Sequence, residues 1–343
     1  MKFYKLILVY MFFFFLIFQS QGFSFHSKTE YALSGKTMGT FYNIKFLADK
    51  NEDLDSWQTR VDICLKDINK TFSMFDPESR LSVFNRLEIK KNMKAPPDFY
   101  SVLLTAQKLY QMTHGAWDGT VKPLVDLWGF GTRKKEDKIP EPSEITLALS
   151  KTGFHHIRLM ENHTISKDTD LTLDLSSIAK GYGVDAVAAL FMSSGISNVL
   201  VEIGGELYAA GKNRKGEPWS VGISRPDKDN SKQDLYKIVR LSNQAIATSG
   251  NYRNFFEMNG KSYHHIIDPK TGFPADGRIV SASVISEDCT FADGLATALM
   301  VMDVKESLRL VNSLEGTECM IIEKNGDVLE SRMSKNFQRF LSD

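Results

Sequence analysis

The sequence predicts an α+β protein in which mixed or antiparallel sheets pack against helices. Two Asn-Gly dipeptides, at 259–260 and 325–326, each lie between strand-like runs. This is the strongest short signal for a β-hairpin, because a type I′ turn requires positive φ at both central residues. Apolar residues recur at helical spacing over residues 56–72. Strands that arrive in hairpins between helices favour this class over a regular parallel sheet.

The N-terminal half begins with "ALSGKTMGTFYNIKF", which predicts a strand pair or a bent strand around Met38-Gly39-Thr40. The helix over 56–72 follows. A second helix is predicted over 98–113, with Asp98 as its N-cap and Gly115 as its stop signal. Residues 132–144 are charged and contain proline, so we expect an exposed loop there.

The C-terminal half alternates strands with two further helices. The stretch 171–195 is expected to be a strand that runs into a helix capped by Ser176 or Ser177. A buried strand over 198–211 breaks at Gly204-Gly205. The remaining expected elements are a hairpin over 255–267, a strand over 279–286, a helix over 289–303 with Thr290 as a possible cap, and a hairpin over 319–331.

The chain of 343 residues is expected to divide into a signal peptide (1–22), a linker (23–33) and one domain (34–343). Two early lysines precede the apolar run from Leu6 to Phe18, and small residues follow near the expected cleavage site. We therefore expect an exported, periplasmic protein. An uncleaved signal that holds the protein at the inner membrane is the alternative. No cysteine lies near the cut, so a lipid anchor is not expected.

Composition narrows the class of protein further. Basic and acidic residues number 42 each, which gives no electrostatic signature of nucleic-acid binding. The three cysteines, Cys64, Cys289 and Cys319, show no metal-binding spacing. They are interpreted as small buried side chains, with a single disulfide as the alternative.

Asp293 and Thr297 are the first candidates for chemistry. They lie four residues apart on a predicted helix and so share one face. A carboxylate and a hydroxyl are hard oxygen ligands that suit Mg²⁺. The structural alternative is that the aspartate complements the helix dipole and the threonine bonds back to a carbonyl.

The glycine-rich stretch "DLSSIAKGYGVD" is the second candidate. A turn into a helix can offer backbone N–H groups to a phosphate, and Asp174 and Lys180 flank this one. Equally, its glycines can serve close packing of the helix. For the paired glycines of "EIGGELYAAG", a tight turn is favoured over contact with a ligand.

Adjacent His264 and His265 point to opposite faces of a strand, so only one of them can face a given site. A histidine beside Asp-Pro is a plausible general base, whereas a hydrogen-bonded structural histidine is the default. The stretch 115–131, which contains Asp118, can form either a loop that stacks a planar ligand or a packed turn.

The order of these stretches is more specific than any one of them. Seven stretches occur in this order: "GKTMGTFYNIKF", "FSMFDPESRLSVFN", "GAWDGTVKPLVDLWGFG", "DLSSIAKGYGVD", "VEIGGELYAAG", "ATSGNYRNFFEMNGKSYHHIIDPKTGFPA" and "DCTFADGLATALMVM". With this order, the chain resembles the FAD:protein FMN transferase (ApbE) family over roughly residues 34–333. The resemblance implies a Mg²⁺-dependent enzyme that takes FAD as substrate. Such an enzyme transfers the FMN moiety to a threonine of a flavoprotein, typically a subunit of a membrane redox complex, and releases AMP. The resemblance also implies that this threonine usually lies in a motif of the type Asp-(Gly/Ser)-Ala-Thr.

The resemblance also implies roles for particular residues. His265 corresponds to the family histidine, and its proposed role is to take the proton of the threonine hydroxyl. The expected metal ligands are Asp293, Thr297 and a backbone carbonyl, that of Ser177. The expected flavin contacts are Met38, Phe75, Ala116, Trp117, Asp118, Asp174, Lys180 and the backbone of Ile267. Backbone N–H groups of residues 177–181 are expected to hold the pyrophosphate.

This sequence departs from the family pattern at two positions. Phe75 stands where a tyrosine is common, and Asn251 where many members have aspartate or glycine. Two other functions use the same residues: an FAD pyrophosphatase, with water as acceptor, and a flavin-binding protein without catalysis.

Overall fold

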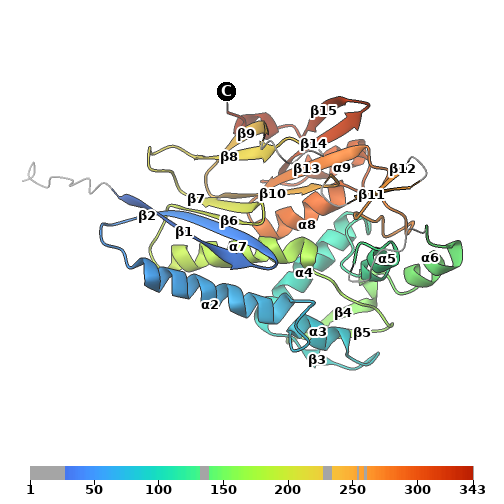
Figure 1. Ribbon diagram of the computed structural model, residues 1–343. Helices are drawn as coiled ribbons and strands as arrows, with labels where there is room; N and C mark the ends of the chain where they lie inside the picture. Colours follow the sequence, from blue (N-terminus) through green and yellow to red (C-terminus); the bar gives the residue numbers. More distant parts are fainter. Residues whose placement is uncertain (1–27, 132–138, 227–233, 253–254, 259–260, 343) are drawn as a thin grey trace, which may run out of the picture.

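An eight-stranded antiparallel sheet forms the centre of the molecule (Figure 1). The computed structural model describes residues 28–131, 139–226, 234–252, 255–258 and 261–342. The strands follow the order β1 (Thr29–Thr37), β2 (Thr40–Ala48), β6 (Val199–Ile203), β7 (Glu206–Ala210), β10 (Gln244–Gly250), β13 (Ile279–Ser286), β14 (Glu318–Asn325) and β15 (Val328–Met333). All neighbours are antiparallel, which confirms the predicted fold class.

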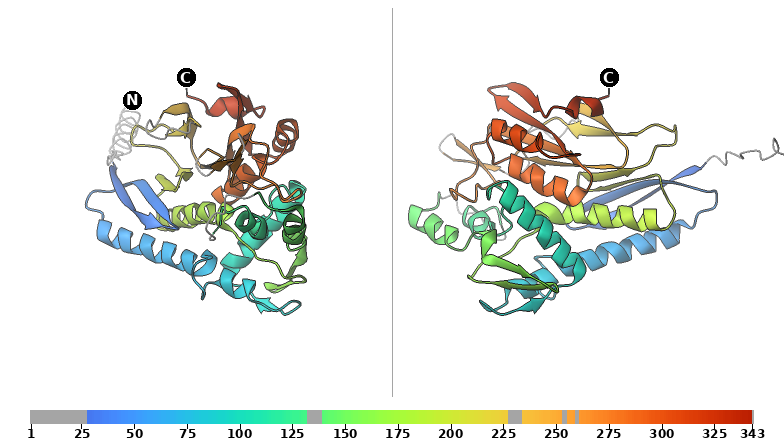
Figure 2. Two further views of the ribbon diagram at one scale, coloured as in Figure 1. Left: turned by 45° about the vertical axis from the view of Figure 1, so that its right-hand side comes forward. Right: turned by 180° about the vertical axis from the view of Figure 1, so that it is seen from behind.

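Helices cover one face of this sheet, as Figures 1 and 2 show. The longest are α2 (Leu54–Phe72), α4 (Pro97–Met112), α7 (Ser176–Ser193) and α8 (Cys289–Leu299). Their apolar faces form the largest hydrophobic core with the inward side chains of the sheet. The shorter helices are α3 (Arg80–Asn85), α5 (Lys122–Leu127), α6 (Pro142–Leu149), α9 (Val304–Val311) and the single turns η1 (Phe154–His156) and η2 (Phe337–Phe340).

A hairpin of β8 (Trp219–Ser224) and β9 (Leu235–Leu241) packs with η2 on the opposite face of the sheet. Trp219 and Phe337 are central to this second core. Two small sheets lie at the periphery: β3 (Met93–Lys94), β5 (Thr164–Lys167) and β4 (Ile157–Met160) form one, and β11 (Phe255–Met258) with β12 (Lys261–His264) forms the other. The candidate site is lined by residues of the central sheet, of α7 and of β8.

Several sequence predictions are wrong at element boundaries. β1 begins at Thr29 and pairs with β2 along its whole length, so the chain is already folded inside the predicted linker 23–33. α4 begins at Pro97 with Pro96 as N-cap, and Asp98 lies in its first turn, because proline's fixed φ suits the first helical position. α6 begins at Pro142, inside the predicted loop 132–144, and residues 132–138 lie outside the described part of the chain.

Helix caps and one strand also differ from expectation. Residues 171–175 belong to no strand. The N–H of Asp174 bonds to the Gly119 carbonyl, and the backbone of Leu173 bonds to the Asn85 side chain instead of to a neighbouring strand. The N-cap of α7 is Leu175, without a side-chain bond, and neither Ser176 nor Ser177 caps it. α8 is capped by Asp288, not by Thr290. The predicted hairpins are confirmed.

The three cysteines are free. Cys289 and Cys319 are buried, as predicted, and Cys64 is partly buried. The predicted signal, 1–22, lies outside the described residues. Among those that are described, no helix is long and apolar enough to span a bilayer.

Candidate functional site

A cavity of about 1570 Å³ opens where the ends of β6, β7 and β10 meet the N-terminal half of α7. Every site residue predicted from the sequence lines it: Met38, Phe75, Ala116, Trp117, Asp118, Asp174, Ser177, Lys180, His265, Ile267, Asp293 and Thr297. These residues come from segments spread over more than 250 positions of the chain. The fold therefore brings the predicted set to one place.

Glycine at position 181 allows α7 and α8 to approach closely. A Cβ atom at Gly181 would lie 2.3 Å from the carbonyl oxygen of Cys289. The N–H of Gly181 donates to Asp293 Oδ2 at 3.0 Å. That N–H is therefore engaged by a carboxylate, and the expectation that it holds pyrophosphate is wrong for this residue.

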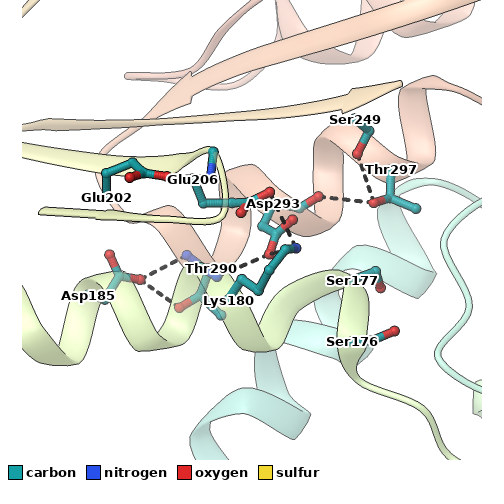
Figure 3. A network of polar contacts seen from close by, with 12 residues as sticks. Ser176, Ser177, Lys180, Asp185, Glu202, Glu206, Ser249, Thr290, Asp293 and Thr297 are labelled. Atoms are coloured by element: carbon teal, nitrogen blue, oxygen red, sulfur yellow. Dashed lines mark hydrogen bonds and ion pairs between the residues drawn. The ribbon is translucent and has the colours of Figure 1, made fainter. Parts of the chain in front are cut away.

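Asp293, Lys180 and Glu206 form a buried charged cluster (Figure 3). Lys180 Nζ lies 3.6 Å from Asp293 Oδ2 and 3.3 Å from Glu206 Oε1. Burial alone would lower the pKa of Lys180, but the two carboxylates raise it above its usual value. The lysine therefore stays charged between them.

Glu206 is 4% exposed, and its buried Oε2 atom has no hydrogen-bond partner among the described residues. Burial, together with the charge of Asp293, raises the pKa of Glu206 to about 8. Burial also raises the pKa of Asp293. A buried carboxylate oxygen without a partner is costly, which marks this cluster as one arranged for something other than stability.

Asp185 holds the start of α8 against α7. Its carboxylate accepts the backbone N–H groups of Cys289 and Thr290, each at 2.8 Å, and the hydroxyl of Thr290 at 2.6 Å. Burial raises the pKa of Asp185 to about 6. Because Asp293 lies one turn further along α8, this contact fixes where Asp293 stands relative to Lys180.

The oxygen donors expected to bind Mg²⁺ lie around the same cluster. Thr297 Oγ1 is 3.1 Å from Ser249 Oγ and bonds back to the Asp293 carbonyl at 3.2 Å. The Ser177 hydroxyl accepts the indole N–H of Trp117 at 3.1 Å. In an α-helix the Ser177 carbonyl would accept from the N–H of Gly181, and that N–H also serves Asp293.

These residues fit a hard divalent cation. A carbonyl oxygen has two lone pairs, so that of Ser177 can bind a cation beside Asp293 and Thr297. Within the described residues no group of three or more His, Cys, Asp or Glu forms a metal cluster. The donor set thus suits Mg²⁺, which is usually held by one or two carboxylates and completed by phosphates and water.

The segment Ala116–Asp118 lines the cavity but is itself packed into the protein. Trp117 is 1% exposed. The carboxylate of Asp118 accepts the N–H and the hydroxyl of Thr120 and the N–H of Phe154. Burial raises the pKa of Asp118. Of the two interpretations of this loop, the packed turn holds for these side chains.

Met38, Phe75 and Asp174 present accessible groups at the rim. The Phe75 ring is 85% exposed, which is unusual for a large apolar side chain and suits a surface on which a planar ligand stacks. Met38 has φ of 48°, a left-handed conformation that directs the turn between β1 and β2. The Asp174 carboxylate bonds to the N–H of Ser176 at 2.9 Å and still borders the cavity.

The two histidines differ as alternation predicts. His265 lines the cavity, whereas His264 does not and is 4% exposed. Burial, with the neighbouring charge of His265, lowers the pKa of His264 to about 4. His264 is therefore a neutral core residue at pH 7.

Sequence reasoning missed Glu206, Ser249 and Asp185. Glu206 follows the Gly204-Gly205 turn and was part of the stretch interpreted as a tight turn, which the β6–β7 hairpin confirms. Its position among strand residues that are otherwise apolar was the available signal. No local sequence signal gave a role to Ser249 or Asp185, because their hydrogen-bond partners are 48 or more residues away in the chain.

The fold and the cavity define a class: an α+β protein with a large cavity whose lining includes a lysine, carboxylates and hydroxyl groups. The chain belongs to the ApbE family, whose family model matches residues 38–321.

Curated relatives and solved structures agree with this assignment. The chain is 41% identical over 312 residues to the FAD:protein FMN transferase of Vibrio cholerae, covering 90% of this chain and 92% of the relative. It is 39% identical over 308 residues to that of Haemophilus influenzae, covering 88% and 89%. The structure of the flavin transferase ApbE from Vibrio cholerae superposes with a TM-score of 0.83, at 39% identity, over 92% of this chain and 100% of the other.

Proposed function

We propose that this protein transfers the FMN moiety of FAD to a threonine hydroxyl of an acceptor flavoprotein, with Mg²⁺, and releases AMP. One observation carries the proposal: the predicted flavin, phosphate and metal residues, scattered in sequence, all line a single cavity. Family membership and the activity of the relatives as FAD:protein FMN transferases support it.

Asp293, Thr297 and the Ser177 carbonyl would hold the Mg²⁺ ion. When bound, it would supply charge neutralisation at the phosphate oxygens. Lys180 adds a fixed positive charge beside this site, held by Asp293 and Glu206. Phosphoryl transfer needs mainly positioning and such neutralisation.

His265 acts as the general base. It accepts the proton of the threonine hydroxyl while that oxygen forms a bond to the phosphorus of the FMN half. The bond from that phosphorus to the bridging oxygen breaks, and the electron pair leaves with AMP. His264 cannot share this role, because it does not line the cavity and its lowered pKa makes it a weak base.

Replacing His265 by alanine should slow FMN transfer by about 10²–10⁴-fold, the usual contribution of a general base. FAD affinity, measured by quenching of flavin fluorescence, should stay the same. The matched control is His264→Phe, which should transfer at the wild-type rate. Transfer by His265→Ala at the wild-type rate would refute the assignment.

We also propose that the protein is exported and acts in the periplasm, on a subunit of a membrane redox complex. The N-terminal sequence, with its early lysines and short apolar run, supports export.

The decisive experiment mixes the purified protein with FAD, Mg²⁺ and a soluble carrier domain that bears an exposed Asp-Gly-Ala-Thr segment. A covalently fluorescent carrier on a denaturing gel is the expected result. Free FMN with AMP would indicate a pyrophosphatase. Unchanged FAD would indicate a protein that binds flavin only.

A further inference from the structure

Strand β8 borders the cavity in an unusual way. Five consecutive residues, 220–224, line it. Successive side chains of a strand point to opposite faces, so a cavity against one face would be lined by alternate residues only. β6 shows that alternate pattern, with Leu200 and Glu202. The cavity therefore runs along the edge of β8.

That edge is unpaired in the described part of the chain. β8 pairs with β9 on one side, from Trp219 opposite Leu241 to Ser224 opposite Leu235, and with no other described strand. In an antiparallel pair, alternate residues direct their N–H and C=O groups away from the partner. These groups of β8 point into the cavity.

The chemistry of β8 leaves the edge accessible. Its outward residues Ser220, Gly222 and Ser224 are small and exposed, while Val221 and Ile223 are buried in the second core. Natural sheets usually protect a free edge with lysine, proline or a bulge toward the open side. The sequence "WSVGIS" of β8 contains neither lysine nor proline, and the register shift beside Ile223 and Ser224 places the extra residue, Tyr236, on β9.

The facing wall is formed by the sheet. Leu200 on β6 and Leu207 on β7 are partly buried and border the same cavity, on the sheet face that β8 covers. Figure 1 shows β8 above β6 and β7, on the side opposite α7. The result is a groove with main-chain donors and acceptors on one wall and two leucines on the other.

We propose that this groove binds the acceptor protein as an extended segment that adds to the free edge of β8 and brings its threonine toward His265. The inference rests on the proposed function. An extended peptide satisfies the main-chain groups of a free edge, while pockets for its side chains select the sequence. The groove is continuous with the cavity that His265 and Asp293 line.

The volume and the placement of the flavin residues favour a polypeptide over a part of FAD. The cavity, about 1570 Å³, exceeds the range of about 300–1,000 Å³ typical of small-molecule sites. None of the residues expected to contact flavin lies on β8. The space along β8 is thus left for the second substrate, which in this reaction is a protein.

The test uses Ser220→Trp and Ser224→Trp, which fill the groove from exposed positions. The control is Arg240→Trp, because Arg240 pairs with Ser220 across the hairpin, is exposed and does not line the cavity. Three quantities are measured for each full-length variant: kcat/KM for the Asp-Gly-Ala-Thr carrier domain, the Kd for FAD, and the melting temperature.

We expect both serine variants to lose at least about tenfold in kcat/KM for the carrier, equivalent to about 1.4 kcal/mol. Their Kd for FAD and melting temperature should match the wild type, and Arg240→Trp should transfer normally. Hydrogen exchange of the β8 amides should also slow when the carrier is added to wild-type protein with FAD.

Other results overturn the groove assignment. Wild-type transfer by the serine variants would show that the acceptor binds elsewhere. A parallel loss of FAD binding would place part of FAD along β8. An equal loss in Arg240→Trp would mean that only hairpin stability matters. Failure of the proposed function is distinct, since the wild-type protein would then form no covalent flavin with any carrier.

Discussion

Two glutamates on opposite faces of the central sheet are almost equally buried, yet their surroundings differ. Glu318, at the start of β14, is 6% exposed, and its carboxylate accepts the hydroxyl of Ser334 and both the backbone and side-chain N–H groups of Asn336. Glu206 is 4% exposed, but its Oε2 atom has no partner among the described residues. Glu318 joins the chain end to the sheet, whereas Glu206 borders the cavity.

The difference separates a structural carboxylate from one placed for function. A buried carboxylate stabilises a fold when its lone pairs are bonded, and it costs free energy when they are not. Around Glu206 and Asp293 the protein tolerates that cost beside Lys180. The same sheet therefore supports a satisfied polar contact on one face and a reactive charged cluster on the other.

The largest expected effect is at Asp293. Asp293→Asn keeps the shape of the side chain and an acceptor for the N–H of Gly181, but it removes the charge that would hold Mg²⁺. Losing about 4 kcal/mol of transition-state stabilisation would slow transfer about a thousandfold. The measurement is the transfer rate as a function of Mg²⁺ concentration. Unaltered Mg²⁺ dependence would mean that Asp293 is structural, like Glu318.

A smaller effect, and on stability instead of activity, is expected at Glu318. Glu318→Ala removes the acceptor of the buried Ser334 hydroxyl and of two N–H groups of the exposed Asn336, and it should lower the free energy of unfolding by about 1–3 kcal/mol. Urea denaturation measures it, and Glu330→Ala on exposed β15 should stay within about 0.5 kcal/mol of wild type. A large loss of transfer activity in folded Glu318→Ala would show that Glu318 is not purely structural, and the contrast with Glu206 would not hold.

The last expected effect is a change in the pH dependence of stability at Glu206. Its pKa in the folded protein, about 8, is above the ordinary 4.5, so folding disfavours its ionisation. Its contribution to stability is present below pH 4.5 and is lost as the pH rises through 8, by at most about 1.4 kcal/mol for each unit of pKa shift. Glu206→Gln should remove this decline.

Thermal or urea unfolding from pH 4 to pH 9 would measure the decline in both proteins. Identical profiles for wild type and Glu206→Gln would show that the carboxyl does not titrate in this range. The Glu206 carboxyl would then keep one charge state between pH 4 and pH 9, and the contrast with Glu318 would be lost.

Much of the fold could be predicted because its signals are local. The two Asn-Gly hairpins and the helical periodicity over 56–72 appear where expected, since turn chemistry and side-chain period act over a few residues. The stretch 171–175 could not be assigned correctly. A strand needs a neighbour, and here Asn85, nearly 90 positions earlier, bonds Leu173 instead.

The candidate site, too, could be predicted where its signals are local and not where they depend on distant residues. The ordered motifs identified the residues that line the cavity. Alternation implied that only one histidine faces it, and the family resemblance selected His265. The motifs gave no role to Glu206, because its approach to Lys180 depends on β7 lying beside β6 above α7. The resemblance also placed Asp118 among the flavin contacts, and the structure adds that its carboxylate is bonded within its own loop and to Phe154.

The sequence by itself determined the family, the order of most elements and the set of residues at the site, since each is written in short patterns along the chain. Only the tertiary structure decided which carboxylates are satisfied, which carry raised pKa values, and which strand edge is left open. Those properties come from burial and from neighbours distant in sequence, and no local pattern specifies either.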